Sequence, residues 1–438
     1  MSQGMRAAWW RPGSAVGDES PGEARTTTES GGPDSAVAFG GLMVFTVILL
    51  TAPQMLFPVL APFRIALLTA LVAVAAHLLH RFARRQPAVM LTREIWVAAG
   101  LLGWAIVTVP LSQWPGGSLS FLLELYLKTL ALFWLLSNTV SSLTRLRRIA
   151  WALTLAGVPV AATGVRHFLS GSFVPGIVDK RIVGYNAPLT ENPNDLALML
   201  NLILPLTVAL VLLTRRPLLR AVLLVIIVLN VTGVIVTFSR AGFLTLATTF
   251  LMYLWKLQRR REGRWAWAVV VLALACVPLL PSGYSERLST ITDIQSDPTG
   301  SAQARWSDTV AAVHFVAKNP IIGAGVGLNA LALNEERGPA WKVVHNMYLE
   351  YAVELGVPGL VMFLLLLVWC IQNTMLVQRR SEGVPGLQEL FYLAQGIQIS
   401  LVAFAVAALF HPGGFHFYFY YVAGLAVALK SVCERGDA

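Results

Sequence analysis

Hydrophobic runs of about 20 residues recur along the chain and are separated by short polar connections. A run of this length crosses the roughly 30 Å hydrocarbon core of a bilayer as an α-helix, which satisfies every backbone polar group internally. We therefore expect an all-α, polytopic membrane protein with about twelve transmembrane helices. The predicted spans are 38–56, 60–80, 95–111, 119–138, 149–165, 195–213, 218–237, 241–257, 265–281, 345–377, 388–410 and 415–432.

The composition agrees with this interpretation, because 56% of the 438 residues are hydrophobic and only 13% are charged. An average soluble domain carries about 25% charged residues, and a disordered chain lacks apolar surface. Both classes are therefore excluded. The net charge of +10 is typical of cytoplasmic loops that face anionic lipid, and we expect no nucleic-acid partner. The three cysteines offer neither a disulfide framework nor metal-ligand spacing.

The placement of basic residues predicts the topology. They gather in alternate connections, whereas the turns at 112–118 and 411–416 contain no lysine or arginine. The positive-inside rule then places both termini in the cytoplasm and, in a bacterial inner membrane, the long outer loops in the periplasm. The predicted order is a disordered cytoplasmic tail (1–37), nine transmembrane helices (38–281) with an outer loop at 166–194, a large periplasmic loop (282–344), three transmembrane helices (345–432) and a short cytoplasmic tail (433–438).

The first outer loop holds an unusual density of polar residues, among them Arg181 and the run Asn192-Pro193-Asn194-Asp195. This run suits a turn that caps the next helix, with Asn194 or Asp195 accepting hydrogen bonds from free backbone N–H groups. Helix N-termini also favour anions. The sequence therefore allows two roles for this run, either capping of the next helix or binding of a phosphate group.

Two arginines are predicted on the outer side, and at Arg240 a tight turn does not require an arginine. Arg240 lies in the turn Ser239-Arg240-Ala241-Gly242 between two apolar spans, and Arg305 lies in the large loop. Arg240 either reaches out to headgroup phosphate or faces inward as an anion ligand.

The large loop contains one predicted helix and one glycine-rich run. The spacing of Val310, Val313 and Val316 predicts an amphipathic helix against the membrane surface. The run Gly323-Ala324-Gly325-Val326-Gly327 resembles a nucleotide-binding loop, but no strand precedes it, so we interpret it as a flexible return to the bundle. We find no folded core in this loop and expect it to act as a lid.

The tenth span begins outside the lipid with His345 and Asn346. Asn346, Glu350 and Glu354 are four residues apart and therefore share one helix face. A carboxylate inside a membrane is a functional candidate, with pairing to a neighbouring helix as the alternative. His345 has a structural and a catalytic interpretation, and the arginines on the same side favour the catalytic one.

Two other polar features receive structural interpretations. Glu124 and Lys128, four residues apart inside the fourth span, are predicted to form an ion pair. The turn His411–His416 and its aromatic neighbours are predicted to form an interfacial belt.

Five short motifs on the outer side occur in an order that resembles the O-antigen ligase and polymerase superfamily, over roughly residues 100–375. They are Arg181…Asn192-Pro193-Asn194, Ser239-Arg240-Ala241-Gly242, Arg305-Trp306, Asn319-Pro320-Ile321-Ile322-Gly323-Ala324-Gly325 and His345-Asn346…Glu354-Leu355-Gly356. Some polymerases carry a glycine eleven residues after an arginine in both outer loops. Here Asn192 and Val316 stand at those positions, which favours the ligase type.

The resemblance implies a GT-C-like membrane glycosyltransferase with short amphipathic helices in its large periplasmic loop. Family members are inverting and metal-independent, and they transfer a glycan from undecaprenyl diphosphate to an acceptor hydroxyl, such as one on lipid A-core or another glycan. By position in the motifs, the essential residues are Arg240, Arg305 and His345. Six further residues are expected to bind substrate, namely Arg181, Asn192, Asn194, Ser239, Asn346 and Glu354. Membrane lipids are expected as a further partner, and no cofactor or metal is expected.

The expected transfer reaction explains why arginine and histidine are suited to these positions. Guanidinium groups bind phosphate bidentately and stay charged, so Arg240 and Arg305 are suited to stabilising a departing diphosphate. A histidine titrates near pH 6.5 in water, which suits His345 to act as a general base, with phosphate positioning as the alternative. A polymerase of the same superfamily, a lipid-linked oligosaccharide transporter and a non-catalytic assembly scaffold are the competing functions. No internal repeat typical of a carrier is found.

Overall fold

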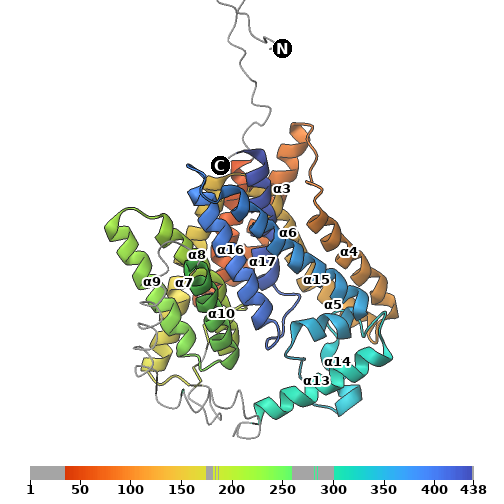
Figure 1. Ribbon diagram of the computed structural model, residues 1–438. Helices are drawn as coiled ribbons and strands as arrows, with labels where there is room; N and C mark the ends of the chain where they lie inside the picture. The colour runs from red at the N-terminus through yellow and green to blue at the C-terminus, as the bar shows by residue number, and fades with distance from the viewer. Residues whose placement is uncertain are drawn as a thin grey trace, which may run out of the picture. The chain divides into compact units, whose positions relative to one another are not determined.

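The computed structural model describes residues 35–173, 181–182, 184–185, 187–258, 281, 284 and 300–436. This part of the chain contains helices and no β-strand (Figure 1). Phe173 and Ile182 form an isolated antiparallel β-bridge. The first elements are α1 (Ala36–Thr51), α2 (Pro53–Leu56), η1 (Pro58–Phe63), α3 (Ile65–Ala83), α4 (Arg93–Thr108), η2 (Val109–Leu111), α5 (Pro115–Phe121), η3 (Leu122–Tyr126), α6 (Leu127–Thr139) and α7 (Leu143–Leu169). They are followed by α8 (Pro193–Leu213), α9 (Pro217–Ile235), α10 (Arg240–Gln258), α13 (Ser301–Lys318), α14 (Asn329–Arg337), α15 (Met347–Ser381), α16 (Gln388–Ala407) and α17 (Phe417–Arg435).

The predicted apolar runs are helical. A helix lies at every predicted span except 265–281, which falls outside the described residues apart from Pro281. Among the described residues, 8 helical segments are long and apolar enough to cross a membrane. The chain is therefore a multi-pass, all-α membrane protein. These segments are Pro58–Ala83, Arg93–Leu111, Pro115–Thr139, Leu143–Leu169, Pro193–Leu213, Pro217–Ile235, Met347–Ser381 and Gln388–Ala407.

The helices differ in how much of their surface the protein covers. In their most apolar stretches, 83% of the α8 segment and 72% of the α16 segment are buried, against 6% for the segment that contains α3. α8 packs against α16, and the Ser400 hydroxyl of α16 donates a hydrogen bond to the carbonyl oxygen of Leu202 at 2.8 Å. α8 and α16 are thus central, whereas α3 exposes apolar side chains such as Leu79 to its surroundings.

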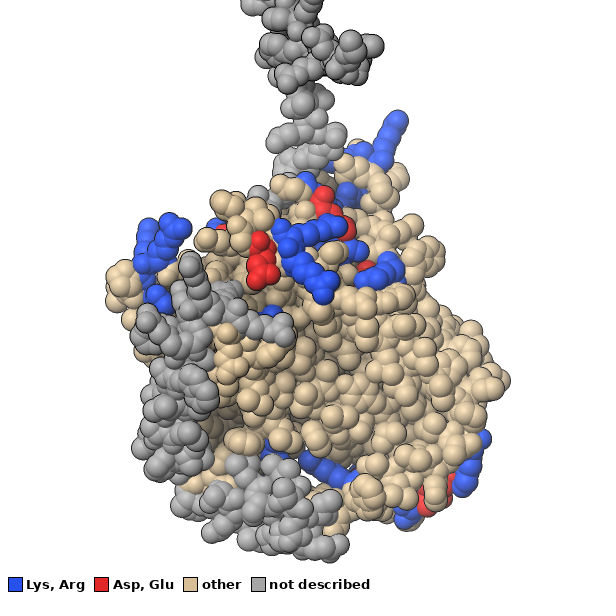
Figure 2. All heavy atoms as spheres, viewed as in Figure 1, with Lys and Arg blue, Asp and Glu red and all other residues tan. Residues whose placement is uncertain are grey.

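The charged residues lie near two ends of the molecule. On the face drawn in Figure 2, lysine, arginine and acidic side chains gather at the two ends, and the described residues drawn between them are mainly of other types. α13 and α14 lie at the end opposite the C-terminal end of α17 (Figure 1). An apolar band between two polar ends is the surface that a bilayer requires.

α15 is two helices that meet at Gly356, where the sequence predicts one long helix. Gly356 has φ 69° and ψ −174°, which interrupts the helical path. A Cβ atom at this position would lie 2.1 Å from the carbonyl oxygen of Ile321. Only glycine accommodates both the positive φ and this close approach. The break therefore receives the segment that returns from the large outer loop.

The glycine-rich run at 323–327 is fixed against α15, which corrects the prediction of a flexible segment. Ala324 N–H donates to the carbonyl oxygen of Val353 at 2.7 Å, and Gly325 N–H donates to that of Glu354 at 2.9 Å. Val357 N–H donates in turn to the carbonyl oxygen of Pro320 at 2.7 Å. The broken helix end thus gains the hydrogen-bond partners that a continuous helix would supply itself.

The large outer loop also has a hydrophobic cluster, contrary to the expectation of a loop without a core. Ala312 and Phe315 of α13 pack with Leu333 of α14 and with Val353 of α15. A buried ion pair joins the same two loop helices, with Arg337 Nε 2.7 Å from Asp308 Oδ1. α13, α14 and the first part of α15 therefore form one packed unit. The prediction of a lid rested on a loop without a core, and this packing removes that premise.

α13 is amphipathic, although only part of the predicted stripe is exposed. Trp306, Val310 and Val313 are 63%, 41% and 52% exposed, whereas Val316 is partly buried against the cluster. The exposed side chains lie on one helix face, opposite Phe315. This face offers an apolar surface to a membrane.

The predicted Glu124–Lys128 ion pair is absent. Both side chains are exposed, and the Glu124 carboxylate accepts a hydrogen bond from Ser120 at 3.2 Å. The span Pro115–Thr139 contains a π-helical turn at Leu122–Tyr126. A π-helical turn changes the local residue spacing, so the regular four-residue spacing on which the prediction rested does not hold here.

Candidate functional site

The N-terminus of α8 is where the first outer loop enters the bundle. The side chain of Asn192 caps the helix by accepting hydrogen bonds from the N–H groups of Asn194 (2.9 Å) and Asp195 (3.1 Å). Pro193 occupies the first turn, where its missing N–H costs nothing. Capping is thus confirmed, but Asn192 is the cap and not the predicted Asn194 or Asp195. The side chains of Asn194 and Asp195 remain available for contacts with other segments.

Asn194 joins the first outer loop to the turn between α9 and α10. Its Oδ1 atom accepts hydrogen bonds from Arg181 Nη2 at 2.9 Å and from the Ser239 hydroxyl at 2.8 Å. Ser239 Oγ also accepts the Gly242 N–H at 3.1 Å and so caps α10. Three residues predicted for the site from separate parts of the sequence therefore meet at one amide oxygen.

Arg240 and Arg305 are linked through α13. Arg240 is the first residue of α10, and its Nη2 atom donates a hydrogen bond to the Ser301 hydroxyl at 2.9 Å. Ser301 begins α13 and lies four residues before Arg305, so both project from the same helix face. The turn before α10 and the loop helix α13 thus bring both predicted arginines to the same side of the molecule.

His345 lies immediately before the cap of α15. Asn346 caps the helix by accepting hydrogen bonds from the N–H groups of Tyr348 (3.0 Å) and Leu349 (3.1 Å). Burial, together with the nearby positive charges of Arg305 and His411, lowers the pKa of His345 to about 4. The buried Nδ1 atom of His345 has no hydrogen-bond partner among the described residues. His345 is therefore neutral at neutral pH and able to accept a proton.

Glu354, predicted as a substrate-binding residue, contacts the protein itself. Its side chain is fully buried. Its Oε2 atom accepts the Gly327 N–H at 2.6 Å, and its Oε1 atom accepts the Asn329 N–H at 3.2 Å. Asn329 Oδ1 then accepts the Val344 N–H at 3.0 Å. Glu354 is thus connected through Asn329 to the residue that precedes His345.

The turn between α16 and α17 is part of the same region, and the sequence prediction missed it. His411 Nε2 lies 2.7 Å from Asp195 Oδ1, and its side chain is 5% exposed. Glu350 Oε2 accepts the N–H groups of Gly413 and Gly414, both at 2.8 Å. The turn is therefore buried against α8 and α15 and does not form the predicted interfacial belt.

A sequence signal for this contact exists. Glu350 and Glu354 lie on one helix face, and each binds the backbone of a glycine-containing turn. Backbone N–H groups that are buried in a membrane protein need hydrogen-bond acceptors. The adjacent glycines Gly413 and Gly414 therefore signal that an acceptor, here Glu350, lies close to this turn.

The combined electrostatics favour an anion. Arg181 contacts Asn194 and Arg240 contacts Ser301, while the charge of Arg305 acts on His345. Three guanidinium groups therefore lie in this region. Guanidinium groups at the edge of a low-dielectric bundle bind phosphate more strongly than they do in open water. In the part of the chain that the structure describes, no group of three or more His, Cys, Asp or Glu side chains is arranged to hold a metal ion.

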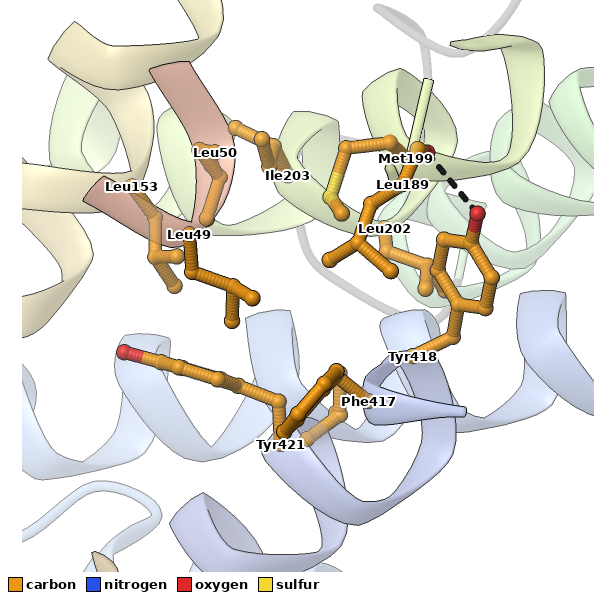
Figure 3. Close-up of a pocket in the computed structure, with 11 residues that line it drawn as sticks. Leu49, Leu50, Leu153, Leu189, Met199, Leu202, Ile203, Phe417, Tyr418 and Tyr421 are labelled. Carbon is orange, nitrogen blue, oxygen red and sulfur yellow. Dashed lines mark hydrogen bonds between the residues drawn. The ribbon is translucent and has the colours of Figure 1, made fainter. Parts of the chain in front are cut away.

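A separate apolar pocket lies among α1, α7, α8 and α17 (Figure 3). Leu49, Leu153, Met199 and Phe417 are among its lining residues. The Tyr418 hydroxyl at its edge donates a hydrogen bond to the carbonyl oxygen of Leu189 at 2.8 Å. The side chains that line this pocket carry no charge, whereas the predicted arginines lie outside it.

Comparison with known families finds a match over part of the chain. Residues 225–364 match the family model described as O-antigen ligase, and the match confirms the resemblance to the O-antigen ligase superfamily. The matched region contains Arg240, Arg305 and His345, whereas Arg181 and the α8 N-terminus lie before it. No curated protein matches the chain.

Proposed function

Since the chain matches the O-antigen ligase superfamily over residues 225–364, we propose that it is an inverting, metal-independent glycosyltransferase. It transfers a glycan from undecaprenyl diphosphate to an acceptor hydroxyl at the periplasmic face. The proposal is carried by one observation, the chain of contacts that joins Arg181 to Asn194, Asn194 to Ser239, and Arg240 to Ser301. These contacts gather cationic groups on the side where the large outer loop lies.

The diphosphate is the leaving group. The bond between the anomeric carbon and the phosphate oxygen breaks, its electron pair stays on the diphosphate, and positive character grows on the sugar. Arg240 and Arg305 bind the diphosphate and stabilise it more strongly as its negative charge rises, which lowers the barrier. Two fixed guanidinium groups can supply the charge stabilisation that a divalent metal gives in other transferases.

His345 is the proposed general base. The acceptor oxygen attacks the anomeric carbon on the face opposite the diphosphate, which inverts the configuration. The proton of the acceptor hydroxyl moves to a ring nitrogen of His345. A neutral imidazole has a free lone pair for this step, and the low pKa of His345, caused by burial and by Arg305, keeps it neutral before the donor binds.

The remaining predicted site residues are proposed to position these groups and the substrate. Arg181 extends the cationic surface towards the glycan or the diphosphate. Asn192, Asn194 and Ser239 hold the α8 and α10 N-termini, whose backbone N–H groups favour anions. Asn346 and Glu354 are assigned to holding His345, because their oxygen atoms already accept backbone hydrogen bonds.

The proposed topology keeps the predicted boundaries. Residues 1–37 and 433–438 are cytoplasmic tails, and the transmembrane parts 38–281 and 345–432 supply twelve spans. The loops 166–194 and 282–344 lie in the periplasm of a bacterial inner membrane. The match of predicted and described helices supports this order, and the exposed face of α13 is proposed to rest on the outer leaflet.

The acceptor is proposed to be a glycan hydroxyl such as one on lipid A-core. A polymerase of the same superfamily uses the same donor and differs only in transferring to a growing glycan. The positions after Arg181 and Arg305 that favour the ligase type are Asn192 and Val316. A lipid-linked oligosaccharide transporter is the competing function, and the break of α15 at Gly356 is the feature that favours it, because carriers use broken helices.

The decisive experiment uses the full chain in lipid nanodiscs with a synthetic polyprenyl-diphosphate glycan. A transferase releases the free polyprenyl diphosphate and lengthens the acceptor, whereas a transporter leaves the donor intact. Parallel reactions with lipid A-core and with a second donor molecule as acceptor separate ligase from polymerase. Addition of EDTA tests metal independence, since a metal-dependent enzyme loses its activity. The absence of diphosphate release with every acceptor would overturn the proposal.

A further inference from the structure

Residues 236–239 reverse the chain between α9 and α10, directly before Arg240. Within this turn Phe238 has φ 53°. This left-handed conformation costs free energy for a residue with a side chain, and glycine usually occupies it where a helix ends. Another residue keeps the conformation only where its surroundings hold it there. The structure therefore maintains a strained backbone two residues before a site arginine.

The ring of Phe238 supplies contacts that hold this conformation. It is 4% exposed and stacks on Phe168 at the end of α7, with the ring centroids 6.1 Å apart. Tyr284, in the predicted large outer loop, meets the same ring edge-on with a centroid distance of 5.4 Å. Such ring pairs contribute beyond the burial of apolar surface. Glycine would adopt the same backbone without strain but could not make these contacts, which gives phenylalanine a role at this position.

Arg240 is held at both ends of its side chain. At the backbone end, the Ser239 N–H donates a hydrogen bond to Thr237 Oγ1 at 3.2 Å, so the turn is closed directly before the arginine. At the other end, Arg240 Nη2 donates to the Ser301 hydroxyl of α13 at 2.9 Å. A change in the turn would move the backbone end while Ser301 still holds the tip, and the guanidinium group would tilt.

We propose that Phe238 is a positioning residue, whose left-handed backbone, held by its ring between Phe168 and Tyr284, directs the start of α10 and thereby aims Arg240 at the diphosphate. Because Phe238 is buried, it acts through Arg240 and not by touching the ligand. The inference deepens the proposed function, and it rests on that function only in taking a diphosphate as the ligand of Arg240.

The test compares F238L with F238G in the full chain in nanodiscs, with inorganic pyrophosphate as the ligand and calorimetry as the measure of its Kd. Leucine fills much of the space of the ring, but it cannot stack and is strained at positive φ. The turn should therefore relax in F238L, and the Kd should rise about tenfold. Glycine accepts the left-handed conformation, so F238G should bind pyrophosphate more tightly than F238L does.

Thermal unfolding of the same two variants separates positioning from packing. F238G removes more buried volume than F238L, and the cost of a large-to-small substitution grows with the cavity that it leaves. F238G should therefore be the less stable protein although it is the tighter binder. A purely structural role of Phe238 would instead give the same order in stability and in affinity, and that result would overturn the proposal.

Double variants with the site arginines locate the effect. If Phe238 acts through Arg240, F238L should weaken pyrophosphate binding much less in an R240K background, where the guanidinium group is already absent. Lysine keeps the positive charge, which retains part of the attraction for pyrophosphate. In an R305K background F238L should keep its full effect. An equal effect of F238L in the two backgrounds would contradict positioning through Arg240.

Further single variants control for the loss of an aromatic contact. F133L removes a buried ring that meets Tyr420 at 6.2 Å between α6 and α17, so it should lower stability without changing the Kd. Y284F keeps the ring that contacts Phe238 and should bind like the wild-type protein, whereas Y284L should weaken binding. Y284L leaves the sequence of the turn unchanged, so it preserves the test if F238L does not fold.

The affinity measurements do not depend on glycan transfer. If transfer fails with every acceptor while the affinities follow the expected order, the proposed function fails and the positioning role stands. If the wild-type protein transfers glycan and F238L binds pyrophosphate with wild-type affinity, the positioning role fails and the function stands. A wild-type protein that does not bind pyrophosphate would also overturn the positioning role.

Discussion

Glu354 is hydrogen-bonded to both the backbone N–H and the side-chain amide of Asn329. Asn329 accepts the Val344 N–H in turn, so a carboxylate two turns inside α15 fixes the peptide directly before His345. The contact explains why an acidic residue lies inside an apolar helix: its oxygen atoms accept hydrogen bonds from the returning loop, so its buried polar atoms have partners.

This connection predicts that E354A destabilises the protein and reduces activity together. The N–H groups of Gly327 and Asn329 would lose their acceptor inside the protein, at a cost of about 1–3 kcal/mol for each unsatisfied group. Thermal unfolding in nanodiscs measures the stability change. E336Q is the matched control, because Glu336 pairs with the exposed Lys318 and such pairs contribute about 0–1 kcal/mol. An E354A protein as stable as E336Q would contradict the assignment.

Replacing Arg240 or Arg305 by lysine should reduce kcat by about 100-fold. Lysine keeps the positive charge but cannot form the bidentate contact of a guanidinium group with phosphate. Initial rates of diphosphate release measure the effect. R147K is the control, since Arg147 pairs with Glu389 outside the candidate site and should retain the wild-type rate. Wild-type rates for both R240K and R305K would remove the bidentate argument.

The proposed base predicts a specific pH profile. Burial and the charge of Arg305 lower the pKa of His345 to about 4, so kcat/KM should stay constant from pH 8 down to about pH 5 and fall below that value. A bound diphosphate favours the protonated form, so the acidic limb of kcat should lie at higher pH than that of kcat/KM. H345Q should lose both limbs together with most of kcat. A wild-type rate for H345Q would exclude the base role.

The same pKa shift has a consequence for stability. The pKa of His345 is lower in the folded protein than the value of about 6.5 expected in the unfolded chain, so the unfolded state binds more protons between these values. The contribution of His345 is fully present above pH 6.5 and is lost as the pH falls towards 4. The melting temperature should therefore decrease over this interval, and H345Q should show a smaller decrease. Equal slopes for both proteins would contradict the shift.

The exposed face of α13 predicts contact with lipid. A dye attached at V313C, in a chain without its native cysteines, should report an apolar environment in nanodiscs, because Val313 lies on the exposed apolar face with Trp306 and Val310. The same dye at E335C, on the exposed side of α14, should report water. Identical spectra at the two positions would show that α13 does not rest on the membrane.

The sequence alone determined the helices and the order of the site motifs. A bilayer accepts only long apolar segments with satisfied backbones, and this requirement is local, so hydropathy places α8, α15 and α16 without knowledge of their partners. The grouping of Arg240 with Arg305 on one side likewise followed from counting spans and basic residues.

Only the tertiary structure decided which polar groups meet. The contacts of His411 with Asp195, of Glu354 with Asn329, and of the glycine run at 323–327 with the break at Gly356 join segments that periodicity treats as independent. Within an apolar bundle each buried polar atom needs a partner, but the pattern of a single helix does not identify which returning loop supplies it. The partner of each polar group depends on how the helices pack. In this fold Asn192 caps α8, and Asp195 lies against His411 of the α16–α17 turn.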